Sequence, residues 1–319
     1  MRVLIQGKRI TILAPRYKFF SEDYLFSIPL LHSINELEQG WSMRTLYSLC
    51  FMLLISQCFA QTREIAITID DLPLVASKMN TPGNQQRSTE RFMRIIAALT
   101  ENKVPATGFV IAGAIAEGQW AFLEAFRNAG FSIGNHTYSH YNLNSMSAEK
   151  YIADLDRADK ILTPLMTEPK YFRYPYLAEG SKITKPKVLD YLTQHHYVIA
   201  PVTIDSKDFE FNERLYKVPF RAREAYVYKV KPSYLAYIWK QTLRAEKQAD
   251  GQPVKQILLI HANLLNSYLL GDIIQLYKEH GYTFITLTDA LKNPAPALSV
   301  PALEPAKDDE KLGSGLLSF

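Results

Sequence analysis

Apolar positions along residues 61–292 recur with two different periods, and the alternation of these periods predicts strands separated by helices. Short apolar runs typical of buried strands cover 64–70, 107–112, 131–134, 171–174, 197–204, 256–261 and 282–287. Apolar residues at helical spacing predict helices over 88–103, 119–128, 147–166, 187–195, 233–249 and 268–280. This alternation indicates an α/β fold with a parallel sheet and helical crossovers, and about seven strands favour a barrel over an open sheet.

Two segments do not follow this pattern. Residues 209–232 are aromatic and irregular, with no clear helical or strand period. Residues 293–319 are rich in proline and alanine and then in charged side chains, which predicts a loose tail. The sequence therefore predicts one catalytic domain over 61–292.

The N-terminal residues match a secretory signal. Met43 and the arginine after it precede an apolar run at 46–55 and a small-residue cleavage site that ends at Ala60. We therefore expect a signal peptide at 43–60 and export to the periplasm or the extracellular space. The run is shorter than the roughly 20 residues that a membrane span needs, so no stable span is expected in the mature chain. Residues 1–42 are interpreted as an overextended reading frame or a poorly structured extension.

Composition narrows the class of protein. The 319 residues are 47% hydrophobic and 21% charged, which is typical of a globular protein with one sizeable core. The net charge of +4 is too small to indicate a nucleic-acid partner. Both cysteines, Cys50 and Cys58, lie in the predicted signal, so the mature chain needs no disulfide and has no thiol nucleophile. Nothing in the sequence indicates an oligomeric state.

Five polar motifs each follow the end of a predicted strand. They are Asp70-Asp71, His136 with His140, Arg173 to Tyr176, Asp208-Phe209 and His261. Because the carboxyl ends of parallel strands meet at one rim of the sheet, we expect these side chains to share a site. Carboxylates, paired histidines, an arginine and a further histidine are sufficient for a metal-dependent hydrolase.

The first two motifs carry the candidate metal ligands. Neighbouring side chains of a strand point to opposite faces, so Asp70 and Asp71 share a site only if the chain turns, and Leu72-Pro73 is predicted to supply that turn. His136 and His140 have i, i+4 spacing, which on a helical turn places both imidazoles on one face, within reach of one ion. Taken singly, the acids also fit a helix cap and the histidines fit a surface pair.

The remaining motifs carry candidate groups for proton transfer. Arg173 is a permanent cation whose simplest use is to hold a carboxylate in its ionised form. His261 can protonate a leaving group, and Asp208 can orient it. Taken singly, Arg173 also fits a surface ion pair and His261 fits a core histidine whose polar atoms are satisfied.

In this order, the five motifs resemble those of the NodB-homology polysaccharide deacetylases, carbohydrate esterase family 4, over roughly residues 64–291. The resemblance implies a distorted (β/α) barrel and a divalent metal, usually Zn²⁺. The roles that it implies are Asp71, His136 and His140 as metal ligands, Asp70 as general base held by Arg173, and His261 as general acid oriented by Asp208. It also implies a substrate pocket lined by Phe209 and Leu259, next to Tyr174, Pro175 and Tyr176, with the Tyr174 N–H as a candidate oxyanion donor.

Two positions depart from the pattern of that family. Leu72 replaces the usual Gly, and Phe209 replaces the usual Trp. We expect Leu72 to narrow the rim and to change the substrate that fits. The predicted function is therefore a metal-dependent hydrolase that removes acetyl groups from an N- or O-acetylated glycan. A metal amidase that acts on a small non-carbohydrate amide and a non-catalytic glycan-binding barrel remain as alternatives.

Residues 209–240 combine aromatic and basic side chains next to the predicted rim. The aromatic ones are Tyr216, Phe220, Tyr226, Tyr228, Tyr234, Tyr237 and Trp239, and the basic ones are Arg214, Lys217, Arg221, Arg223, Lys229 and Lys231. The segment fits a groove for an anionic glycan. It fits equally well a helix that is packed by its aromatic residues, with the basic residues in solvent.

Overall fold

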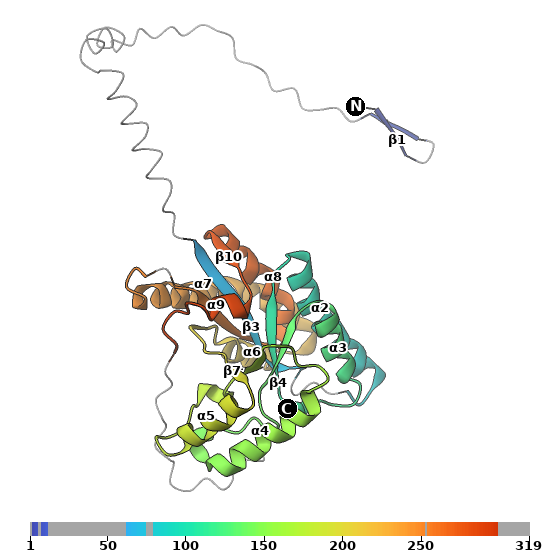
Figure 1. Ribbon diagram of the computed structural model, residues 1–319. Coiled ribbons are helices and arrows are strands. Elements are labelled where there is room, and N and C mark those ends of the chain that lie inside the picture. The colour runs from blue at the N-terminus through green and yellow to red at the C-terminus, as the bar shows by residue number, and fades with distance from the viewer. Residues whose placement is uncertain (1, 6–7, 12–61, 75–78, 253, 299–319) are drawn as a thin grey trace, which may run out of the picture. The chain divides into compact units, whose positions relative to one another are not determined.

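The computed structural model describes residues 2–5, 8–11, 62–74, 79–252 and 254–298, and the chain divides into one unit of residues 1–60 and one of residues 61–319 (Figure 1). In the first unit, β1 (Arg2–Ile5) pairs antiparallel with β2 (Lys8–Thr11). The predicted signal peptide at 43–60 and the rest of the leading segment lie outside the described residues, so both stay predictions.

The second unit is built on a parallel sheet. Its strands are β3 (Arg63–Leu72), β4 (Ala106–Val110), β5 (Ser132–Asn135), β6 (Lys170–Phe172), β7 (Tyr197–Ile199), β8 (Ile204–Asp205), β9 (Gln256–His261) and β10 (Tyr282–Phe284). They follow the order β7-β6-β5-β4-β3-β9-β8, and β10 pairs with the start of β3. The long central strand β3 therefore contacts both halves of the sheet, and its last residues lie in the middle of the rim.

The two ends of this sheet are joined by the chain itself. β7 and β8 lie at opposite ends of the strand order but are separated by only residues 200–203. Ala200 N donates to Phe172 O on one side (2.8 Å), and Thr203 N donates to Ile257 O on the other (3.0 Å). The predicted strand at 197–204 is thus split in two. The result confirms the predicted distorted (β/α) barrel.

The alternation of side chains along β3 explains how the barrel encloses a site. Ile65, Ile67 and Ile69 are fully buried in the large core that the barrel shares with its helices. The residues between them are smaller or polar, and Ala66 belongs to a second apolar cluster with Phe109 and Ile257. Successive strand residues point to opposite faces, so residues 66, 68 and 70 line the barrel interior, from an apolar floor up to a carboxylate at the rim.

Helices surround the barrel. They are α2 (Pro82–Glu101), α3 (Trp120–Asn128), α4 (Ala148–Leu162), α5 (Thr184–Gln194), α6 (Asp208–Tyr216), α7 (Arg223–Gln248), α8 (Leu264–Glu279) and α9 (Leu287–Ala290). Figure 1 shows α2 next to α3 and α8 on one side of the barrel, and α4 next to α5 on another. Several helices begin earlier than predicted. α2 begins at Pro82 because Thr81 caps it, and Ser88, where the predicted helix begins, is buried inside α2.

The segment at 209–232, predicted to be irregular, is largely helical. It forms α6 and the first turns of α7, a 26-residue helix that contains Pro232. Proline inside a helix and a run of bulky aromatic residues both obscure the helical period. Tyr234 of α7 is fully buried in the main core, so packing against the barrel stabilises this helix despite the proline.

The first part of the predicted loose tail is bound to the barrel. Ala295 N donates to Lys255 O (2.8 Å), and Leu298 N donates to Val202 O (2.7 Å). The expectation of a loose tail from residue 293 is therefore wrong for residues 293–298, and residues 299–319 lie outside the described part. Within the part of the chain that the structure describes, no helix is long and apolar enough to span a bilayer.

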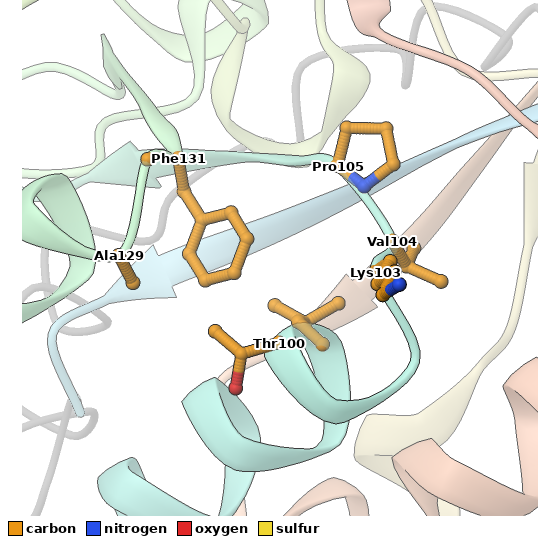
Figure 2. Close-up of a pocket in the computed structure, with 8 residues that line it drawn as sticks. Thr100, Lys103, Val104, Pro105, Ala129 and Phe131 are labelled. Atoms are coloured by element: carbon orange, nitrogen blue, oxygen red, sulfur yellow. The ribbon is translucent and has the colours of Figure 1, made fainter.

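A surface hollow of about 320 Å³ lies at the amino-terminal ends of the strands (Figure 2). Its lining comes from the end of α2, from Val104 and Pro105 before β4, and from Phe131 before β5. Parallel α/β barrels carry their chemistry at the other, carboxyl-terminal rim. The hollow is therefore separate from the candidate site.

Candidate active site

The two adjacent acids reach the same site through an irregularity inside β3. The register between β3 and β4 shifts between Ile69 and Leu72, and Asp71 has a left-handed backbone with φ 62°. A bulge of this kind places neighbouring side chains on one side of a strand. As a result, Asp70 Oδ2 and Asp71 Oδ1 lie 3.7 and 3.8 Å from His136 Nε2. The turn predicted at Leu72-Pro73 is not what brings the two carboxylates together.

Leu72 does not narrow the rim, contrary to the expectation from the sequence. Its side chain is fully buried in the main core. It packs so closely on Gly108 that a Cβ added there would lie 2.0 Å from Leu72 Cδ1. The replacement of the usual glycine at position 72 is therefore accommodated on the helix side of the sheet, where a glycine of the neighbouring strand makes room for it.

His136 and His140 converge from a loop, so the predicted helical turn is wrong. Residues 136–140 follow β5 without regular structure, and Thr137 and His140 have φ values of 65° and 55°. Side chains hold this loop. Asn135 Oδ1 accepts from Thr137 N (2.7 Å), Thr137 Oγ1 accepts from His140 N (3.0 Å), and Asp154 Oδ2 accepts from the backbone N–H of residues 138 and 139. The spacing that seemed helical is thus realised by a tight, hydrogen-bonded loop.

The candidate metal ligands come together as predicted. One ligand atom each of Asp71, His136 and His140 lie within 4.8 Å of one another. Asp71 Oδ1 is buried without a hydrogen-bond partner among the described residues, and it lies 3.5 Å from His140 Nε2. A buried carboxylate oxygen without a partner costs free energy of folding unless a hydrogen-bond donor or a cation binds it. Two histidines and one carboxylate are a donor set that suits a divalent cation.

The protonation states also suit a cation. Burial, together with the neighbouring His140, lowers the pKa of His136 to about 3, so its imidazole is neutral near pH 7. His136 Nδ1 donates to the backbone oxygen of Arg173 (2.8 Å), which leaves Nε2 as the free acceptor in the site. Burial works against ionisation of Asp71, but the charges of His140, His261 and His136 lower its pKa. The site therefore offers the lone pair of His136 Nε2 and the carboxylate of Asp71, with His140 Nε2 3.5 Å from Asp71 Oδ1.

Arg173 is fully buried below the rim and holds Asp70. Its Nη1 lies 3.2 Å from Asp70 Oδ1, its Nε donates to Ala200 O (2.8 Å), and its guanidinium lies 4.5 Å from the centre of the Phe109 ring. Burial raises the pKa of Asp70, and the charges of Arg173 and His261 reduce that rise without cancelling it. An arginine that cannot lose its proton therefore anchors a carboxylate that is poised to accept one.

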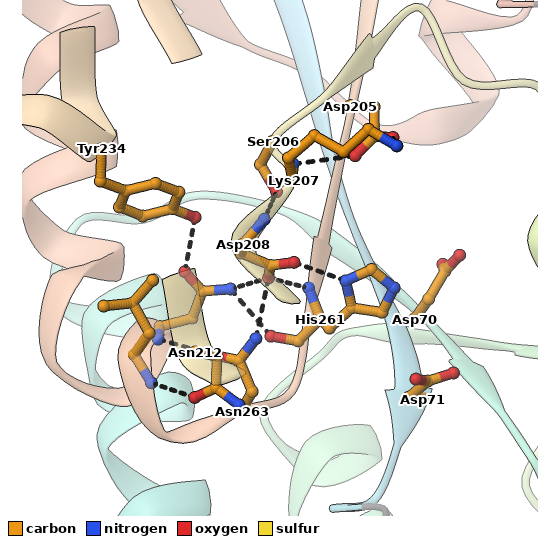
Figure 3. Close-up of polar contacts among 12 residues, drawn as sticks. Asp70, Asp71, Asp205, Ser206, Lys207, Asp208, Asn212, Tyr234, His261 and Asn263 are labelled. Atoms are coloured by element: carbon orange, nitrogen blue, oxygen red, sulfur yellow. Dashed lines mark hydrogen bonds and ion pairs between the residues drawn. The ribbon is translucent and has the colours of Figure 1, made fainter. Parts of the chain in front are cut away.

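His261, the last residue of β9, faces Asp208, the first residue of α6 (Figure 3). Asp208 is fully buried and accepts from both the backbone N and Nδ1 of His261, each at 2.6 Å. Burial alone would lower the pKa of His261, but the Asp208 carboxylate and, more weakly, Asp71 and Asp70 raise it to about 10. His261 is therefore protonated near neutral pH and its Nε2 is a proton donor.

Two asparagines around Asp208 had not been singled out in the sequence, and Tyr234 had been named only as one of the aromatic residues of 209–240. Asn263 Nδ2 donates to Asp208 Oδ2 (3.1 Å), and Asn266 Nδ2 donates both to Asp208 Oδ2 and to the backbone oxygen of His261 (2.9 Å). Tyr234 of α7 in turn donates to Asn266 Oδ1 (2.9 Å). A signal was present, since Asn263 follows the strand as the cap of α8. The link to Tyr234 crosses 32 residues of sequence and had no local signal.

The predicted substrate pocket is only partly assembled as expected. Tyr176 is 48% exposed with its ring 4.6 Å from that of His140, and Phe209 is 46% exposed with its ring perpendicular to His261 at 6.0 Å. Leu259 is buried two residues before His261, on the same face of β9. The side chain of Tyr174, however, packs in a separate core cluster with Tyr151, so only its backbone remains a candidate for the site. Pro175 is buried.

Comparison with known proteins agrees with the motifs. Residues 60–199 match the family model of polysaccharide deacetylases. The peptidoglycan-N-acetylglucosamine deacetylase of Bacillus cereus is 29% identical over 148 residues, which are 46% of this chain and 46% of that protein. A chitin deacetylase of Colletotrichum lindemuthianum is 28% identical over 169 residues, which are 50% of this chain and 58% of that protein. The chain thus spans about half the length of these relatives.

A solved structure shares the fold. The crystal structure of a peptidoglycan N-acetylglucosamine deacetylase superposes with a TM-score of 0.52 at 22% sequence identity, over 73% of this chain and 90% of that one. This similarity supports the distorted barrel independently of the motifs. Residues 60–199 are thus similar to the polysaccharide deacetylase family, and the solved structure shows that the fold is shared.

Proposed function

We propose that this protein is a metal-dependent deacetylase that removes the acetyl group from an N-acetylated glycan. The observation that carries the proposal is the meeting, at one rim, of a candidate cation site with two different proton-handling groups. The candidate cation site consists of Asp71, His136 and His140. The two proton-handling groups are Asp70, held by Arg173, and His261, held by Asp208. The relatives named as peptidoglycan and chitin deacetylases support the same reaction class.

The residues present fit a divalent metal, and we assign its ligands as Asp71, His136 and His140. The unpaired buried oxygen of Asp71 and the neutral, oriented His136 are what such an ion requires. Imidazole and carboxylate donors together suit Zn²⁺ best among the common divalent ions. When bound, the ion would acidify a water molecule and polarise the acetyl carbonyl.

The remaining groups handle the protons. Asp70 lies on the ligand side of the rim, 3.7 Å from His136, so it is placed to take a proton from the attacking water. Burial raises the pKa of this carboxylate, and the guanidinium of Arg173 holds it in position and opposes that rise. His261 carries a proton at the same pH and can give it to the departing amine, which leaves poorly without one. One acid and one base on opposite sides of a substrate are the arrangement that amide hydrolysis needs.

The alternative of a small non-carbohydrate amide rested on Leu72, and its burial removes that support. Tyr176 and Phe209 instead present two exposed rings on either side of the catalytic groups. Exposed aromatic faces next to a reactive centre suit a sugar ring that stacks on them. Hydrolysis of an O-acetyl group would use the same residues and differ only in its leaving group, an alcohol instead of an amine. Assays with N-acetylated and O-acetylated substrates distinguish the two reactions.

Acetate release tests the proposal directly. The panel is chitooligosaccharide, peptidoglycan, acetylxylan and a small amide, each with and without a chelator, for the wild type and Asp70→Asn. We expect release from an N-acetylated glycan that the chelator abolishes, and about a 10²–10⁴-fold lower kcat in Asp70→Asn with metal content retained. The surface carboxylate variant Asp272→Asn is the matched control. Normal turnover by Asp70→Asn would refute its role as the base.

Export is a separate proposal. The apolar run at 46–55 and the small residues up to Ala60 support a cleaved signal. The first strand of the barrel, β3, begins shortly after this point, at Arg63. N-terminal sequencing of the protein from the periplasm or the culture medium should find Gln61 as the first residue. A mature chain that retains Leu30 would contradict both the signal and the assignment of residues 1–42 as an overextended reading frame.

A further inference from the structure

A stripe of arginines runs along α2, next to the rim. Arg87, Arg91 and Arg94 are spaced i, i+4 and i+7 and so share one face of the helix. Each contacts an aromatic residue of another element. Arg87 lies 5.8 Å from the ring of Phe220, Arg91 Nη1 donates to the Tyr216 hydroxyl (3.3 Å), and Arg94 lies 4.7 Å from the ring of Tyr268.

A fourth arginine joins this stripe from the start of α7. Arg223 lies 4.8 Å from the ring of Tyr216 and 5.8 Å from that of Phe220. The two rings remain 45% and 62% exposed, so they are not packed into the core. We call Arg87, Arg91, Arg223, Tyr216 and Phe220 the arginine–aromatic surface. It combines flat apolar faces with guanidinium groups that the same rings hold in place.

The positive charge of this surface is not compensated. Among the described residues, no carboxylate lies within 4.0 Å of the guanidinium nitrogens of Arg87, Arg91 or Arg223, whereas basic residues close by are paired. Lys217 binds Glu213 at 2.6 Å and Lys231 binds Asp272 at 2.5 Å. Two of the three arginines donate to neutral backbone or amide oxygens: Arg223 Nε to Val218 O (3.1 Å) and Nη2 to Tyr216 O (3.2 Å), and Arg87 Nη2 to Asn84 Oδ1 (2.6 Å). These neutral acceptors hold the guanidinium groups without cancelling their charge, which is left to attract an external anion.

The surface lies in line with the catalytic groups. α6 begins at Asp208, which holds His261, and ends at Tyr216. Tyr216 is eight positions after Asp208, which along a helix is about 12 Å at 1.5 Å per residue. Phe209, exposed against His261, lies at the near end of the same helix. A glycan whose acetylated sugar lies at His261 can therefore extend along α6 to the arginines.

We propose that the arginine–aromatic surface binds carboxylate groups carried by the substrate chain, so that the enzyme prefers a carboxylate-bearing acetylated glycan to a neutral one. This inference rests on the proposed function. A guanidinium group matches the two oxygens of a carboxylate in a bidentate pair, and the exposed rings provide apolar area for the sugars between those carboxylates. Of the two named substrates of the relatives, a peptidoglycan strand with free peptide carboxylates meets this requirement and chitin does not.

The test compares two soluble substrates of equal length, a peptidoglycan fragment with free carboxylates and a neutral chitooligosaccharide. The variants are Arg87→Gln, Arg91→Gln, Arg223→Gln and the triple variant. Arg244→Gln is the control, because that arginine is exposed on the far part of α7 and donates to its helix neighbour Gln241. The triple variant should lose about tenfold more kcat/KM on the anionic than on the neutral substrate, and 0.5 M salt should erase the wild-type preference. Equal losses on both substrates would overturn the proposal.

A binding measurement separates this inference from the proposed function. Asp70→Asn protein should bind the peptidoglycan fragment more tightly than the same fragment with amidated carboxylates. The arginine substitutions, added to Asp70→Asn, should weaken binding only of the free-carboxylate form. Binding that ignores amidation, or single-stranded DNA that binds as tightly as the glycan, would overturn the carboxylate-glycan assignment. If no glycan releases acetate but the amidation effect is present, the proposed function fails and the binding surface stands.

Discussion

The two halves of the catalytic rim are built in opposite ways. On the β3 and β5 side, the nearest oxygen and nitrogen atoms of Asp71 and the two histidines lie 3.5–3.8 Å apart, and one buried oxygen has no donor. On the β9 side, Asp208 accepts from four donors and binds His261 at 2.6 Å. Unpaired buried polar atoms cost free energy, whereas paired ones do not. The polar atoms of the first half are therefore satisfied only when a ligand binds, whereas those of the second half are satisfied by the fold itself.

The two halves also differ in backbone conformation. The ligand half depends on left-handed residues, with φ of 62° at Asp71, 65° at Thr137 and 55° at His140. Such conformations are costly for residues other than glycine and persist where the surroundings enforce them. The acid half has one left-handed residue, Lys207 with φ of 51° directly before Asp208, whereas His261 and Asp208 themselves lie at the regular ends of a strand and a helix. Left-handed residues are thus more numerous in the half that would bind the cation.

Breaking the ligand half should have the largest effect. His136→Ala should remove the bound metal and reduce activity below detection, because two ligands do not retain a catalytic ion. Wild-type protein should gain about 2.7 kcal/mol of unfolding free energy at a Zn²⁺ concentration 100 times its Kd, and the variant should gain none. Metal analysis and urea unfolding measure both. The exposed His195→Ala is the control, and full metal occupancy in His136→Ala would disprove the ligand assignment.

Breaking the acid half should spare the metal. His261→Gln should lower kcat by about 10²–10⁴-fold while metal content stays at the wild-type level, because His261 supplies a proton and no ligand atom. Single-turnover acetate release together with metal analysis separates the two properties. A parallel fall in both would mean that the two halves are not independent, contrary to the comparison above.

The pH dependence should distinguish the halves as well. The pKa of His261 is raised from 6.5 to about 10 in the folded protein, so its pairing with Asp208 stabilises the fold fully below pH 6.5 and is lost as the pH rises through about 10. In the metal-free protein, NMR titration of the His261 ring should give the raised value, and Asp208→Asn should lower it. The alkaline limb of kcat/KM should move to lower pH in that variant. An unshifted limb would argue that another group is the acid.

The smallest expected effect concerns a substitution that touches only the acid half. Asn266→Leu removes the amide that donates to Asp208 and to the His261 backbone oxygen, and it takes away the acceptor of the buried Tyr234 hydroxyl. We expect a loss of about 1–3 kcal/mol of unfolding free energy and a lower His261 pKa, with metal content unchanged. Asn266→Gln, which keeps the amide, should restore part of the pKa. A stability loss without any change of the pKa would assign Asn266 a structural role only.

Much of the site was predictable from short stretches of sequence. The apolar run of β3 predicts both the strand and the carboxylate that ends it, and the same holds for β9 and His261. The contacts that position these residues were harder to predict from the sequence. The bulge at Asp71, the loop that carries His136 and His140, and the Tyr234–Asn266 contact depend on neighbouring strands and helices that no local pattern reveals.

The order and chemistry of the polar residues, the strand–helix alternation and the family resemblance follow from the sequence alone, since periodicity and motif spacing are local properties of the chain. The tertiary structure alone decided that Leu72 is buried away from the rim, that a loop rather than a helix presents the two histidines, and that arginines of α2 meet rings of α6 and α7. The physical reason is that these outcomes depend on packing and hydrogen bonds between segments far apart in the chain, which are settled only when the whole barrel closes.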